Sequence, residues 1–160
     1  MTDKLADEII EFAKAHGKTV AVAESCSAGR LAQLFSKAEG ASKHFLGGVV
    51  AYTKQTKRRV LAVPGDVLEA GTAVCGPVAE AMASGAAILL GADLGLAITG
   101  VAGPKPDEDG NPVGLVYCAV ATNSGRSKHI RLQSAQRSPD EVIDEACHQA
   151  LCLLRDFCAA

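Results

Sequence analysis

The chain has 160 residues, 48% of them hydrophobic, and a formal net charge of -2 at pH 7. This length and composition suit one compact domain, residues 1–160, with a substantial core, and the lack of a basic excess argues against nucleic acid as a partner. The longest apolar runs are too short to cross a bilayer, and the acidic, amphipathic start does not resemble a signal peptide. We therefore expect a soluble, cytoplasmic protein with no membrane partner.

The first 60 residues are expected to alternate helices with strands. An amphipathic helix over 1–14, stopped by Gly17, precedes a continuously apolar strand over 19–23, of the kind that is buried on both faces of a parallel sheet. A second helix follows, then a strand over 45–52 whose glycine pair suggests a bulge, and then a third helix capped by Thr53.

The second half of the chain completes a layered pattern. We expect a helical turn, a long helix, a buried strand, two antiparallel strands and a final helix, over 66–70, 78–90, 94–98, 113–122, 129–133 and from 138 onward. This order indicates an α/β domain with a mixed sheet of about five strands.

The six cysteines stand at scattered spacings inside apolar segments and form no C-x-x-C or Cys/His ligand pattern. Small buried thiols in a reducing cytosol are the simplest interpretation. We expect no disulfide, no metal site and no cofactor.

One stretch collects an unusual number of reactive side chains: Glu24, Ser25, Cys26, Ser27, Ser42, Tyr52 and Lys57. Hydroxyls, a phenol and an amine are the parts of a hydrolase whose serine is deprotonated by a lysine. Ligands of α/β sheets bind beyond the carboxyl ends of parallel strands, which here carry Ser25, Tyr52 and Thr99. The reactive groups are therefore expected to converge.

Two loops of small residues favour binding of an anion or a carbonyl group. Residues 25–29 form a strand-to-helix turn, where backbone N–H groups and the helix dipole face a ligand, although Ser25 and Ser27 also suit simple caps of the helix. Residues 99–104 follow a strand as a phosphate or carbonyl cradle would, and they match neither a Rossmann nor a P-loop pattern. Residues 105–112 suit an exposed loop that forms one wall of a pocket.

Lys57 is the candidate general base. The positive helix terminus and the neighbouring cations Lys54 and Arg58 disfavour its ammonium form, so we expect a lowered pKa. The alternative is a lysine on a solvated basic helix face.

Five segments together resemble one family: A-E-S-C-S-A-G at 23–29, G-A-S at 40–42, V-A-Y-T-K-Q-T-K at 50–57, T-G-V-A-G-P at 99–104 and P-V-G at 112–114. In this order they are similar to the CinA carboxyl-terminal domain family, the nicotinamide mononucleotide deamidases also called PncC. The resemblance implies a three-layer α/β/α sandwich with a mostly parallel sheet. It also implies metal-free hydrolysis of nicotinamide mononucleotide to nicotinate mononucleotide and ammonia, in pyridine nucleotide salvage. In some members of the family this domain follows a larger domain, and others are stand-alone. This chain is expected to be the stand-alone form.

The resemblance assigns roles to residues as well. The family's serine nucleophile matches Ser42 and its lysine base matches Lys57, while the assisting serine and tyrosine match Ser25 and Tyr52. The expected substrate-binding residues lie in the two small-residue turns and at one cation for a phosphate: Glu24, Cys26, Ser27, Ala28, Gly29, Thr99, Gly100, Ala102, Gly103 and Arg137. A homodimer or a higher homo-oligomer is expected.

The chain departs from the family at Cys75, at Asn111 and in the loop over 105–110, where members usually carry a serine, a lysine and a Gly-Gly-containing loop. A related amide therefore stays open as the substrate. The nucleophile is also open, since Cys26 or Ser25 are alternatives to Ser42. A non-catalytic nucleotide-binding or dimerisation module of the same fold is the alternative from another class.

Overall fold

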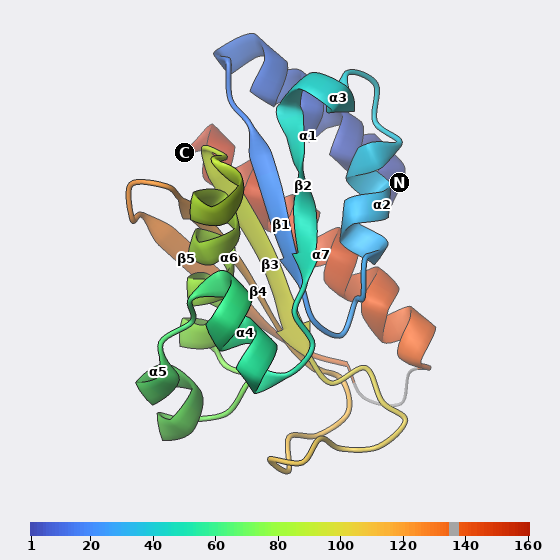
Figure 1. Ribbon diagram of the computed structural model, residues 1–160. Coiled ribbons are helices and arrows are strands. Elements are labelled where there is room, and N and C mark those ends of the chain that lie inside the picture. Colours follow the sequence, from blue (N-terminus) through green and yellow to red (C-terminus); the bar gives the residue numbers. More distant parts are fainter. Residues whose placement is uncertain (135–137) are drawn as a thin grey trace.

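Two continuously apolar segments form inner strands of a five-stranded sheet in the computed structural model, which describes residues 1–134 and 138–160 (Figure 1). These strands, β1 (Val20–Glu24) and β3 (Leu94–Gly100), are buried along almost their whole length. Helices cover both faces of the sheet, so an apolar side chain on either face of these strands is removed from water.

The strand order is β2-β1-β3-β4-β5, with β2 (Phe45–Val50), β4 (Leu115–Thr122) and β5 (Ser127–Gln133) as the remaining strands. Both β2 and β3 pair in parallel with β1, whereas β4 pairs antiparallel with β3 and with β5. Four strands therefore point in one direction and β4 in the other, which confirms the mixed, mostly parallel sheet.

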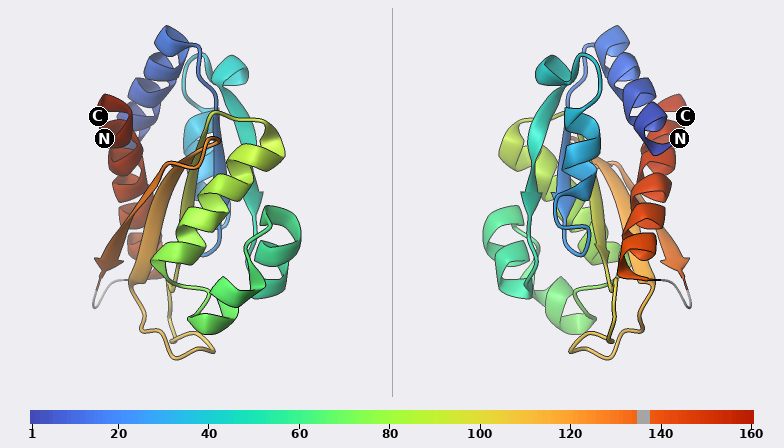
Figure 2. Two further views of the ribbon diagram at one scale, coloured as in Figure 1. Left: turned by 90° about the vertical axis from the view of Figure 1, so that its left-hand side faces the viewer. Right: turned by 90° about the vertical axis from the view of Figure 1, so that its right-hand side faces the viewer.

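The helices form one layer on each face of the sheet, so the three-layer α/β/α sandwich is confirmed (Figures 1 and 2). One layer contains α1 (Thr2–His16), α2 (Arg30–Ser36), α3 (Ala41–His44) and α7 (Pro139–Ala159). The other contains α4 (Lys54–Leu61), α5 (Gly65–Ala70) and α6 (Gly76–Leu90). Within the described chain, no helix is long and apolar enough to cross a membrane.

The predicted end signals of the helices are confirmed. Gly17 ends α1 in the left-handed conformation, with φ of 61°. At the start of α4 the hydroxyl of Thr53 accepts the N–H of Thr56 at 3.1 Å, and at the start of α7 the hydroxyl of Ser138 accepts the N–H of Glu141 at 3.3 Å. The expected bulge in β2 is present as a shift of its register against β1.

Side chains of different size fill the two sides of the sheet. The core under α1, α2 and α7 is built largely from Leu, Ile, Val and Phe, whereas the core under α6 is rich in alanine. A Cβ added at Gly95 would lie 1.8 Å from the carbonyl oxygen of Ala83, and one added at Gly85 would lie 2.0 Å from that of Leu61. Helix α6 therefore lies directly against both the sheet and the end of α4.

Candidate active site

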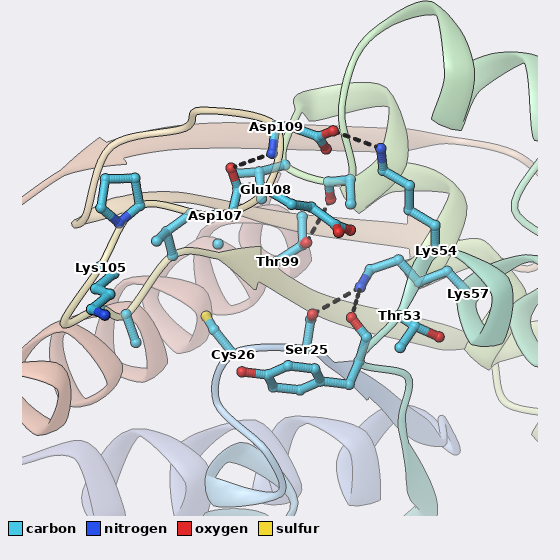
Figure 3. Close-up of a pocket in the computed structure, with 18 residues that line it drawn as sticks. Ser25, Cys26, Thr53, Lys54, Lys57, Thr99, Lys105, Asp107, Glu108 and Asp109 are labelled. Atoms are coloured by element: carbon cyan, nitrogen blue, oxygen red, sulfur yellow. Dashed lines mark hydrogen bonds and ion pairs between the residues drawn. The ribbon is translucent and has the colours of Figure 1, made fainter.

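A pocket of about 450 Å³ opens at the carboxyl ends of β1, β2 and β3 (Figure 3). The sequence predicted that reactive side chains converge at this edge of the sheet, and buried Ser25, Lys57 and Thr99 line the pocket there. Residues 105–109 form another part of its lining, so the expected loop wall is confirmed.

Lys57 is the central polar side chain of the pocket. Only 1% of it is exposed, because α4 carries it against the end of the sheet. Its amine donates to the hydroxyl of Ser25 at 2.8 Å and to the carbonyl oxygens of Ala51 and Tyr52 at 2.9 Å each. The alternative of a solvated surface lysine is therefore wrong.

The three partners of this amine define its chemistry in each protonation state. An ammonium group uses three N–H donors, one for each partner, whereas a neutral amine has two N–H donors and one lone pair. Carbonyl oxygens only accept, so Ser25 is the one partner of the three that can donate a proton to the lone pair. Neutral Lys57 is therefore arranged to accept the proton of the Ser25 hydroxyl.

Burial lowers the pKa of Lys57 to about 8, and the nearby Cys26 acts in the opposite direction. The expected direction of the shift is confirmed, but its expected cause is wrong. Lys54 lies 2.8 Å from Asp109, whose carboxylate neutralises it, and loss of water around the amine of Lys57 dominates. About a tenth of Lys57 is then neutral at pH 7.

Cys26 lines the pocket beside Ser25. Burial raises the pKa of its thiol to about 12, although the charge of Lys57 acts to lower it. The thiolate is the nucleophilic form of cysteine, so a thiol held protonated at neutral pH is a poor nucleophile. The raised pKa of the thiol and the hydrogen bond between Lys57 and Ser25 thus favour the hydroxyl of Ser25 over the thiol of Cys26.

Glu24 was expected at the substrate, but it does not line the pocket. Its side chain is 1% exposed, and its two carboxylate oxygens accept the N–H groups of Leu31 at 2.8 Å and Ala32 at 2.9 Å. These N–H groups lie in the first turn of α2 and have no partner within the helix. Glu24 therefore caps α2, a role for which the sequence had suggested Ser25 and Ser27.

The two small-residue turns differ in their relation to the pocket. Thr99, Gly100, Ala102 and Gly103 line it, as predicted, and Thr99 donates its hydroxyl to the carbonyl oxygen of Ala73 at 2.8 Å. In the other turn only Ser25 and Cys26 reach the pocket. The other three residues of this turn do not line the pocket, namely Ser27, Ala28 and Gly29.

Ser42 was expected to contact Lys57, and the structure does not bring them together. Ser42 is exposed on α3, which precedes β2, whereas Lys57 lies on α4, which follows it (Figure 1). Residues 45–53 separate the two helices, and the six of them that form β2 alone span roughly 20 Å at about 3.3 Å per residue. Within one chain Ser42 therefore does not lie beside Lys57, and Ser25 occupies that place.

Tyr52 lies at the mouth of the pocket and is 69% exposed. Its link to Lys57 is its backbone carbonyl oxygen. The expected phenol contact with the amine is absent from the hydrogen bonds of the described residues.

Arg137 lies outside the described residues, and within them no group of three or more His, Cys, Asp or Glu side chains is placed to hold a metal ion.

The family model of the CinA C-terminal domain matches residues 2–158. The chain belongs to this family. A CinA-like protein of Synechococcus is 42% identical over 153 residues, which make up 96% of this chain and 37% of that protein. The chain thus spans little more than a third of that relative's length.

Solved structures of the CinA superfamily share the fold. A Klebsiella pneumoniae protein superposes with a TM-score of 0.93 at 30% identity, over 99% of this chain and 98% of that chain. A competence/damage inducible protein of Agrobacterium tumefaciens gives a TM-score of 0.91 at 32% identity, over 97% and 94% of the two chains.

Sequence reasoning missed several contacts that shape the pocket of this CinA domain. The carbonyl oxygen of Ala51 binds Lys57, and side-chain contacts of Lys54, Asp109 and Asn111 hold the pocket rim. Backbone acceptors carry no residue signature, and the partners of the rim residues are 39 to 55 positions away in the chain. Nothing in the local pattern could have paired them.

Proposed function

We propose that this CinA domain is an amidohydrolase in which Ser25 attacks a carboxamide and Lys57 is the general base. The observation that carries the proposal is the set of three partners of the Lys57 amine, because Ser25 is the only proton donor among them. The lowered pKa of Lys57 supports it, since the neutral amine is accessible near neutral pH.

The reaction proceeds in two halves. Neutral Lys57 takes the hydroxyl proton of Ser25, whose oxygen bonds to the carboxamide carbon and gives a tetrahedral oxyanion. The C–N bond then breaks, the proton on Lys57 passes to the departing nitrogen, and ammonia leaves an acyl-enzyme. Water loses a proton to Lys57 and attacks the ester, and that proton returns to Ser25 as the acid is released.

We place the oxyanion donors in the turn over 100–103, because it lines the same pocket as Ser25 and Lys57. The turn over 27–29 does not line the pocket. Backbone N–H groups directed at a developing oxyanion typically lower the barrier by about 3 kcal/mol each.

Nicotinamide mononucleotide is the proposed substrate, with a related amide as the alternative. The family resemblance supports a pyridine carboxamide, and the pocket volume of about 450 Å³ is within the range of small-molecule sites. Lys105 lines the pocket and is exposed, so it offers a cation for a phosphate group.

An ammonia-release assay on the purified protein tests this function. The panel contains nicotinamide mononucleotide, nicotinamide riboside, nicotinamide and simple aliphatic amides, each with and without a chelator. Turnover that is lost in Ser25→Ala and unaffected by the chelator supports the proposal. Binding of a pyridine nucleotide without ammonia release would instead favour the non-catalytic module.

We also propose that two copies associate through β2. The edge strands of the sheet are β2 and β5, and β5 carries Lys128, His129 and Arg131, whereas β2 has no charged residue and exposes Leu46 and Val50. Uncharged apolar edges favour pairing with another strand. Light scattering after gel filtration is expected to give a dimer mass that Leu46→Lys lowers to that of a monomer, and a monomeric wild type would contradict this.

A further inference from the structure

Three segments of the pocket rim meet at the carboxylate of Asp109. The amine of Lys54, the first residue of α4, donates to it at 2.8 Å (Figure 3). The backbone of Ala73, in the connection between α5 and α6, also lowers the pKa of this carboxylate and so lies close to it. One side chain of the loop thus joins α4 and the segment before α6, and Asp109, Lys54 and Ala73 all line the pocket.

The loop that carries Asp109 is braced from within. Asp107 accepts the backbone N–H groups of Asp109 at 3.1 Å and Asn111 at 2.8 Å, and it also accepts the side-chain amide of Asn111 at 2.8 Å. The same amide donates to the hydroxyl of Thr72 at 2.9 Å. The loop therefore behaves as one unit that is tied to 72–73 on one side, and Asp109 supplies its tie to α4.

Each partner of this contact favours the charged form of the other. The amine of Lys54 holds the pKa of Asp109 below its ordinary value, and Asp109 in turn raises the pKa of Lys54. The two side chains are 23% and 37% exposed, so solvent screens the pair only in part. Lys57 lies three residues after Lys54 on the same helix, so the tie attaches the loop to the element that carries the proposed base.

We propose that Asp109 is a positioning residue of the amidase site, which holds the loop over 105–112 against the start of α4 and so fixes the pocket above Ser25 and Lys57. Asp109 has no contact with Ser25 or Lys57 among the hydrogen bonds of the described residues, and its effect passes through the loop. This proposal rests on the proposed function for its kinetic consequence. Its structural consequence, a loop fastened by one carboxylate, is independent of turnover.

The kinetic test compares Asp109→Asn, Lys54→Met and the double variant. Loss of the tie is expected to raise KM for the amide substrate about five-fold in each single variant, with kcat changed less than about two-fold, because a partly exposed, charge-assisted contact is removed while the reacting groups stay in place. The double variant is expected to match the single variants, since both remove the same contact. Asp156→Asn, which breaks the surface ion pair of Arg155 and Asp156 far from this loop in the chain, is the matched control and should leave KM unchanged.

Hydrogen exchange provides the second readout and needs no turnover. Backbone amides of 105–112 are expected to exchange faster in Asp109→Asn and in Lys54→Met than in the wild type or in Asp156→Asn. Unchanged exchange in this loop overturns the proposal, and so does a fall in kcat at constant KM. If the wild-type protein releases no ammonia, the proposed function fails, and the exchange experiment still decides whether Asp109 positions the loop.

Discussion

The amine of Lys57 lies 2.8 Å from the hydroxyl of Ser25, and its two other partners are the backbone carbonyl oxygens of Ala51 and Tyr52. This arrangement gives the lysine one proton donor and two fixed acceptors. The orientation of its lone pair is thereby set by the backbone, before any substrate enters.

Replacement of Ser25 by alanine is expected to lower kcat for ammonia release by at least about a thousand-fold, because the covalent route is removed. Ser42→Ala is the matched control, since Ser42 is an exposed serine at the other end of β2, and it should keep most of the wild-type kcat. Steady-state kinetics of both variants measures the difference. Loss of activity in Ser42→Ala, but not in Ser25→Ala, would identify Ser42 as the nucleophile.

The value of kcat/KM is expected to rise with pH through an apparent pKa near 8 and then to level off, because only neutral Lys57 accepts the proton of Ser25. Lys57→Arg should be nearly inactive, since a guanidinium group is not deprotonated at working pH. The exposed residue Lys43 provides the control as Lys43→Arg. A flat pH profile, or an active Lys57→Arg variant, would remove Lys57 from the mechanism.

The same shift predicts how stability depends on pH. The folded-state pKa of Lys57, about 8, is below the ordinary value of 10.5, so the unfolded chain binds the extra proton more tightly and stability rises with pH across this window. Relative to Lys57→Met, the unfolding free energy of the wild type should increase by about 2 to 3 kcal/mol between pH 7 and pH 10. Urea unfolding at several pH values measures it. A constant difference between the two proteins would mean that Lys57 titrates normally.

Glu24→Ala is expected to lower the unfolding free energy by about 2 kcal/mol, because two backbone N–H groups at the start of α2 lose their charged acceptor. Its kcat/KM, measured where the variant is folded, should stay close to that of the wild type. Glu39→Ala, at an exposed position shortly after α2, should leave both quantities unchanged. A large rise in KM with normal stability would instead place Glu24 at the substrate.

Most of the fold could be predicted from the sequence, because its signals are local. Gly17, Thr53 and Ser138 mark helix ends through hydrogen bonds to residues within four positions, and buried strands are recognisable as unbroken apolar runs. The convergence of Ser25 and Lys57 on one pocket could also be predicted from the sequence, because the strand ends of a parallel sheet meet at one edge.

The predictions that failed concern the direction of a side chain and contacts between residues far apart in the chain. Glu24 is the last residue of β1, and its carboxylate binds the start of α2 rather than the pocket. The turn between β1 and α2 has a positive φ at Ala28, which the residue type does not predict. Ser42 was assigned from family resemblance, although its place before β2 puts it at the amino end of that strand. The cause of the Lys57 shift was misjudged because Lys54 is neutralised by Asp109, 55 positions later.

The close approach at Gly85 couples the packing of α6 to the position of α4. Helix α6 touches the carbonyl of Leu61, the last residue of the helix that carries Lys57, with no space for one more carbon atom. A methyl group at position 85 would force α6 and the end of α4 apart, and Lys57 lies only four residues before Leu61 on that helix. Gly85→Ala is therefore expected to disturb both the packing of the two helices and the position of the Lys57 amine beside Ser25.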